Sequence, residues 1–254
     1  MHVVVEATAD GRPDTSLAEG LPGLLCGVAA DQVALGWTHA AIGSYLTLAG
    51  AHEEGRALLV QALGHFRQAG DLRGQAFAHL WASLACAWTG NWGEAITQGE
   101  QALALYRQAG DRRGQGHALA SLGECHARQG NYDLARGYAQ QVLQAAPTTD
   151  DPMTLAFAWD ALGFVHSALG EPRQAMSCYQ QALAFARERQ NSLARKMLVI
   201  MLAEFGDACR AAGDLPAAAD AWQQALQLLH DLRLPDSLGI RARLEQSGLP
   251  SPPG

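Results

Sequence analysis

Apolar side chains recur at helical spacing along most of the chain. A representative run places them at Leu155, Trp159, Leu162 and Val165. Spacings of three and four residues bring side chains onto one face of an α-helix. The pattern predicts an all-α protein. Residues 2–6 have strand-like composition, but we interpret them as a loose terminus.

The helical pattern repeats with a period of about 40 residues, which indicates a repeat architecture. Glycines mark the successive copies at Gly50, Gly90, Gly130 and Gly170, and a glutamine follows each of them at a constant offset, beginning with Gln61. A fifth copy, marked by Gly213, comes three residues late. We expect the three extra residues in the first helix of the fifth unit, around residues 196–202.

Each unit is predicted to contain two helices separated by a glycine and a capping residue. Glycine adopts the left-handed conformation that ends a helix without steric cost. Asn91 and Asp214 follow their glycines as N-caps, and Glu94 adds the acidic partner of a capping box. Gly70-Asp71 repeats this signal between units, and Asp151-Pro152 places proline at the first helical position.

The unit resembles the tetratricopeptide repeat. Residues 159–166 are Trp-x-x-Leu-Gly-x-x-His and residues 175–179 are Ala-x-x-x-Tyr, close to the Trp-x-x-Leu-Gly-x-x-Tyr and Ala-x-x-x-Phe fingerprint. The period departs from the family pattern, because it is longer than the roughly 34 residues of that repeat. The resemblance implies a right-handed superhelical solenoid of antiparallel helix pairs, whose first helices line a concave groove.

Residues 71–244 also resemble the C-terminal repeat domain of the streptomycete-type antibiotic regulatory proteins and their NB-ARC ATPase relatives. Segments 154–163, 205–214 and 234–244 carry this likeness. In that family the repeats follow a DNA-binding domain and a nucleotide switch. The resemblance implies a signal-sensing or partner-docking role in a regulatory or biosynthetic setting. We expect neither of the other domains in this chain, so the repeats would carry its function.

The repeat divides the chain into three parts. Residues 1–30 are expected to be an N-terminal extension that covers the solenoid end, and residues 236–254 a capping helix with a frayed tail. Between them, residues 31–235 form five helix pairs: 31–70, 71–110, 111–150, 151–190 and 191–235.

Composition narrows the range of partners. The net charge is -7, and Lys196 is the only lysine, which argues against direct nucleic-acid binding and against an anionic membrane surface. No apolar run approaches the roughly 18 residues of a membrane helix. The cysteines are dispersed, as expected for reduced, buried thiols of a cytoplasmic protein: Cys26, Cys86, Cys125, Cys178 and Cys209.

The predicted binding site is the groove wall, aromatic in its N-terminal half and ionic in its C-terminal half. Its candidate residues are Trp37, Phe77, Leu80, Trp81, Leu84, Trp88, His117, Glu124, Phe157, Asp160, Phe164, Glu204, Asp207 and Arg210. Exposed aromatics of this kind are typical anchors for a peptide helix or an apolar ligand. Two alternatives remain: the longer helices tilt these rings into the core, or the N-terminal segment fills the groove.

We therefore predict a non-catalytic binding or sensor module without cofactor or metal, since the sequence contains no catalytic motif. Paired histidines one repeat apart, such as His126 and His166, are interpreted as packing residues. The favoured partner is a protein segment; an apolar small molecule and a second copy of the chain are alternatives. The rival function is a small-molecule-binding protein or enzyme with a closed groove.

Overall fold

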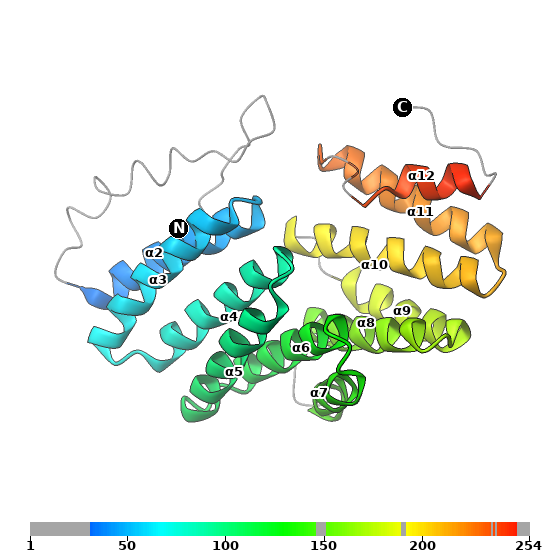
Figure 1. Ribbon diagram of the computed structural model, residues 1–254. Coiled ribbons are helices and arrows are strands. Elements are labelled where there is room, and N and C mark those ends of the chain that lie inside the picture. Colours follow the sequence, from blue (N-terminus) through cyan, green and yellow to red (C-terminus); the bar gives the residue numbers. More distant parts are fainter. Residues whose placement is uncertain (1–30, 146–150, 189–191, 235, 237, 248–254) are drawn as a thin grey trace. The chain divides into compact units, whose positions relative to one another are not determined.

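The computed structural model describes residues 31–145, 151–188, 192–234, 236 and 238–247 (Figure 1). Within these ranges every regular element is an α-helix. The all-α fold predicted from the periodicity is confirmed. The predicted cover at residues 1–30, Cys26 within it, and the tail after Ser247 lie outside the described residues.

The helices follow one another in pairs. Their bounds are α2 (Gln32–Leu48) and α3 (His52–Ala69), α4 (Leu72–Trp88) and α5 (Trp92–Gln108), α6 (Arg112–Arg128) and α7 (Tyr132–Ala145), α8 (Pro152–Ala168) and α9 (Pro172–Ala186), α10 (Ser192–Ala211) and α11 (Leu215–Asp231), then α12 (Ile240–Gln246). Helix α10 has 20 residues and α8 has 17, so the three extra residues lengthen the first helix of the fifth unit.

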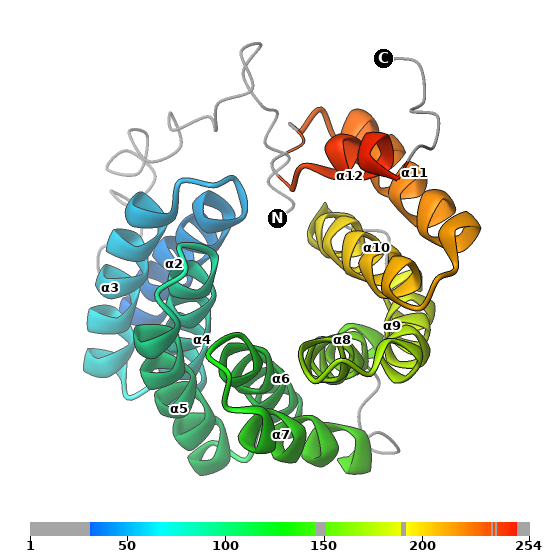
Figure 2. The same ribbon diagram turned by 45° about the vertical axis from the view of Figure 1, so that its right-hand side comes forward.

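The chain forms two compact units, Met1–Cys125 and His126–Gly254, and α6 runs across their boundary. In the first unit α4 packs against α2, α3 and α5. In the second, α8 packs on α7, α9 and α10, while α11 joins α10 to the short α12 (Figure 2). Within each unit the first helices therefore lie side by side, and this positions the predicted groove residues.

The glycine stops form as predicted, and Asn91 and Asp214 cap their helices, whereas the Asp151 side chain makes no cap bond to the start of α8. Gly90 and Gly213 have φ values of 77° and 84°, in the left-handed region. The Asn91 side chain accepts the backbone N–H of Glu94 at 3.3 Å. The capping-box prediction is only half right, because the N–H of Asn91 donates to the Cys86 carbonyl at 2.9 Å and the Glu94 carboxylate accepts from Gln98.

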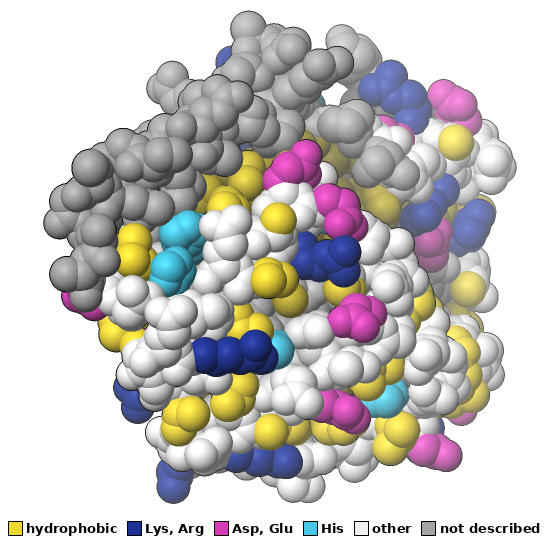
Figure 3. Space-filling model, turned by 60° about the vertical axis from the view of Figure 1, so that its left-hand side comes forward, with side chains coloured by type: hydrophobic (Ala, Val, Ile, Leu, Met, Phe, Trp, Pro, Cys, Tyr) yellow, Lys and Arg dark blue, Asp and Glu magenta, His cyan; other side chains and the backbone are white. Residues whose placement is uncertain are grey.

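Small side chains let the helices approach closely. Alanines such as Ala62 and Ala78 are almost fully buried and pack around the ring of Phe66. The face in Figure 3 shows acidic, basic and histidine side chains scattered among hydrophobic ones, with no patch of one sign. In the described part of the chain, no helix combines the length and hydrophobicity needed to cross a membrane.

Candidate functional site

Three aromatic side chains on α2 and α4 form a contiguous ladder in the first unit. The ring centroids of Trp37 and Phe77 are 5.2 Å apart, and those of Phe77 and Trp81 are 6.0 Å apart. Trp37 also meets the buried ring of Phe66 edge-on at 5.1 Å. These separations are typical of favourable aromatic pairs. We call Trp37, Phe77 and Trp81 the aromatic ladder.

The ladder is anchored in the core and open on one side. Trp37 is 39% exposed, as is Val33 one turn earlier on α2. Phe77 and Trp81 are half-buried. By contrast, Leu80 is only 8% exposed, so it belongs to the packing between helices and not to an open wall. The ring contacts bring three of the predicted groove residues together, but the sequence did not separate the exposed residues of the set from the buried ones.

The other predicted residues of the first unit are half-buried. Trp88 at the end of α4 lies against the ring of His52 at 5.6 Å, which fixes it at the start of α3. Leu84 is half-buried on α4, and His117 and Glu124 are half-buried on α6.

In the second unit, arginine–carboxylate pairs cross between helices. Arg128 at the end of α6 donates to Glu204 on α10 at 2.5 Å, and its guanidinium lies 4.3 Å from the ring centroid of Phe164 on α8. Both charged side chains are about one-fifth exposed, at 21% and 17%. Arg128 thus spans α8 to reach α10. Phe157 is half-buried on α8, and Asp160 is buried at 4% exposed.

A second ionic cluster lies where α12 meets α10. Arg243 donates to Asp207 at 2.7 Å, and Arg210 lies 3.5 Å from the other oxygen of Asp207. Burial raises the pKa of the Asp207 carboxyl, although Arg243 and Arg210 oppose that shift. Arg210 also lies 5.6 Å from the Trp222 ring. The predicted carboxylates Glu204 and Asp207 therefore already have arginine partners within the protein.

Sequence reasoning missed Arg128 and Arg243. Arg128 is 76 residues from Glu204 and Arg243 is 36 residues from Asp207 in the chain, so no local pattern joins them. It also missed a pocket between α3, α4 and α5 in the first unit, which none of the predicted groove residues lines.

The paired histidines have partners within the protein. His126 stacks on Tyr138 with an interplanar angle of 10°, and His166 lies 2.6 Å from a Glu171 oxygen. His39 bonds to the Leu35 carbonyl at 2.8 Å. These contacts give the histidines packing and helix-end roles.

Two family models of the tetratricopeptide repeat match the chain, over residues 74–148 and 158–193. These two segments match tetratricopeptide repeats. Such repeats generally bind protein partners, and the fold is typically non-catalytic. The tetratricopeptide-type solenoid class predicted from the sequence is confirmed.

Solved structures with the same fold cover nearly the whole chain. BtubC (BKLC) from P. vanneervenii has a TM-score of 0.63 at 16% identity, covering 94% of this chain and 93% of its own. The APC/C hetero-tetramer Cut9-Hcn1 has a TM-score of 0.69 at 22% sequence identity, and the match covers 92% of this chain and 39% of that chain. The apo quorum sensor NprR from B. thuringiensis has a TM-score of 0.65 at 17% sequence identity, and the match covers 92% of this chain and 63% of that chain. This chain thus spans less than two thirds of the length of the Cut9-Hcn1 and NprR chains. No curated protein matches the sequence.

Proposed function

We propose that this protein is a non-catalytic recognition module that binds a segment of a partner protein over the aromatic ladder. The observation that carries the proposal is the exposure of Trp37 at 39% while its ring is held by Phe66 and Phe77. A large aromatic side chain kept rigid and partly in water has little ordering entropy left to lose on binding. Tryptophan is among the residues that dominate binding energies at interfaces.

The neighbouring residues suit an apolar segment. Val33 extends the exposed apolar strip by one turn along α2, and Trp81 extends it along α4. Burying such surface contributes about 25 cal/mol per Å². An amphipathic helix or extended segment with apolar anchors fits this chemistry.

A regulatory setting is part of the proposal. It rests on the resemblance of segments 154–163, 205–214 and 234–244 to the repeat domains of antibiotic regulatory proteins. In such a setting the repeats would sense a partner or signal in the cytoplasm.

The test uses a displayed library of random peptides selected on the whole chain. Affinities of the selected peptides are then measured for the wild type, for Phe77→Ala/Trp81→Ala and for Trp37→Ser. We expect each ladder variant to lose about tenfold or more in affinity. Circular dichroism checks that helical content is kept, and Trp37→Ser covers the case in which the double variant unfolds.

The control is Leu134→Ala on α7, an apolar side chain that is 54% exposed outside the ladder. It should change the affinity by less than about twofold. Equal affinities for the wild type and for folded ladder variants would refute binding at the ladder.

A further inference from the structure

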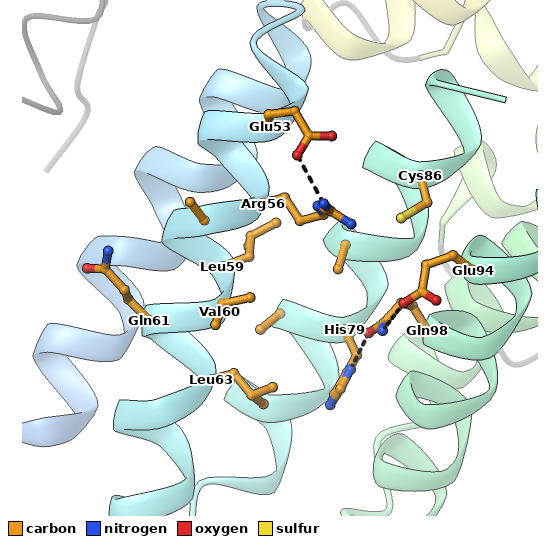
Figure 4. A pocket seen from close by; sticks show the side chains of 13 residues that line it. Glu53, Arg56, Leu59, Val60, Gln61, Leu63, His79, Cys86, Glu94 and Gln98 are labelled. Carbon is orange, nitrogen blue, oxygen red and sulfur yellow. Dashed lines mark hydrogen bonds and ion pairs between the residues drawn. The ribbon is translucent and has the colours of Figure 1, made fainter. Parts of the chain in front are cut away.

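A pocket of about 510 Å³ opens between α3 and α5, with α4 forming its floor (Figure 4). Small-molecule sites in proteins commonly measure about 300–1,000 Å³. Its apolar lining comes from α3 and α4, and its polar lining from all three helices. The polar side chains drawn in Figure 4 are Glu53, Arg56, Gln61, His79, Glu94 and Gln98.

The α4 floor of the pocket carries a small side chain at a fingerprint position. On α4 the position of the fingerprint leucine is Ala82, whereas the same column holds Ile42, Leu122 and Leu162 in other first helices. Leu122 is fully buried there. Ala82 lines the floor of the pocket.

The side chains at two equivalent positions one repeat later are larger. Cys86 and Gln98 of the pocket correspond to His126 and Tyr138, whose rings stack with centroids 5.4 Å apart. The second repeat therefore has smaller or more flexible side chains at these two positions.

A hydrogen-bonded chain orients the wall formed by α4 and α5. The Gln98 Nε2 donates to the Glu94 carboxylate at 2.7 Å, and a carboxylate only accepts, so the amide orientation is fixed. The Gln98 Oε1 then accepts from Nδ1 of His79 at 2.7 Å. In the neutral imidazole Nε2 is left as an acceptor. Both ends of this chain, Glu94 and His79, thus offer acceptors to a ligand.

The charges at the pocket favour a cation. Arg56 donates to Glu53 at 3.0 Å, so these two opposite charges sum to zero at the lining. Glu94 then leaves one negative charge in excess at the lining. Arg56 also interacts with the Cys86 thiol, whose pKa burial raises, so this sulfur adds no negative charge.

We propose that this pocket binds a small organic amine, with its ammonium group against Glu94 and its apolar body over Ala82. The apolar side chains of Val60 and Leu63 on α3 line this part of the pocket. An ammonium has only donors, which matches the acceptors of the α4–α5 wall. An anion would meet Glu94 and a guanidinium already paired with Glu53, which disfavours phosphate and carboxylate ligands.

This site is independent of the proposed function. It shares no residue with the aromatic ladder, so peptide binding and amine binding can fail separately.

The test titrates the whole chain with hexylammonium, 1-hexanol and hexanoate, followed by ¹H–¹⁵N NMR. We expect saturable shifts in amides of α3, α4 and α5 with hexylammonium, and an affinity about tenfold or more above that of the alcohol and the carboxylate. Comparable affinity for all three would overturn recognition of the charge. The absence of saturable shifts in these helices would overturn the site.

Two variants and two controls complete the test. Ala82→Leu restores the side chain used in other repeats and should reduce hexylammonium affinity about tenfold or more by filling the floor. Glu94→Gln should reduce it about fivefold or more. Ala104→Leu and Glu100→Gln, at exposed positions of α5 outside the pocket, should leave it unchanged. Unchanged binding in Ala82→Leu or in Glu94→Gln, with thermal unfolding confirming a folded chain, would refute the proposal.

Discussion

The ring of Tyr179 on α9 lies directly over the Cα of Gly163 on α8, so that a Cβ at Gly163 would stand 2.7 Å from its Cε1 atom. The same relationship recurs in the next repeat, where a Cβ at Gly206 would lie 2.4 Å from the indole Nε1 of Trp222. In each pair one helix contributes a large aromatic ring and the other contributes a glycine, which has no side chain. Close packing of this kind tolerates no added atom without a shift of the ring or the backbone.

Gly163→Ala should therefore lower the free energy of unfolding by about 2 kcal/mol, because overpacking outweighs the better helix propensity of alanine. The measurement is urea unfolding followed by circular dichroism. Gly137→Ala on α7 is the matched control, since nothing lies within 4 Å of its Cβ position, and it should raise stability by about 0.5–1 kcal/mol. Two changes of the same sign would contradict this explanation.

The pair Arg128–Glu204 should couple α6 to α10 energetically. Arg128→Met keeps an apolar stem over Phe164 and removes the charge, which leaves Glu204 without its guanidinium partner at a largely buried site. We expect a loss of about 2 kcal/mol in unfolding free energy. A double-mutant cycle with Glu204→Gln should give a coupling of about 1 kcal/mol or more. Additive effects of the two substitutions would show that the ion pair contributes nothing.

Asp207 should make stability fall as pH rises. Burial raises the pKa of its carboxyl in the folded state, so the folded chain binds more protons than the unfolded chain between the two pKa values. The free energy of unfolding then decreases from about pH 4 upward, until the folded-state pKa is passed. Asp207→Asn cannot ionise, so its stability relative to the wild type should improve across that window. A relative loss instead would mean that Arg243 and Arg210 outweigh burial.

The buried thiols should resist alkylation in the folded chain. Burial raises the pKa of Cys125 to about 12 and that of Cys209 to about 11, and the thiolate is the reactive form. At pH 8 we expect iodoacetamide to label both at least about 100-fold more slowly than in the unfolded chain. Peptide mass spectrometry with and without guanidinium chloride measures the ratio. Equal labelling of Cys125 in both states would show that it is accessible.

The aromatic ladder and the pocket differ in how far sequence reasoning could reach them. Trp37 and Phe77 are in the same column of successive repeats, so the period itself brings them onto neighbouring helices. The sequence indicated the pocket only weakly, through Ala82, which occupies a position where other first helices carry larger residues. This alanine points to a pocket only when the packing of α3 and α5 around it is known.

The repeat, the helix ends and the ladder were determined by the sequence, because each depends on local conformational preference or on a period that acts identically in every unit. Gly90 ends a helix and Asn91 begins one through contacts within a few residues. The tertiary structure alone decided that Arg128 reaches Glu204, that Arg243 reaches Asp207 and that Leu80 is buried. Those outcomes depend on distances between side chains far apart in the chain, which are fixed only when the helices pack.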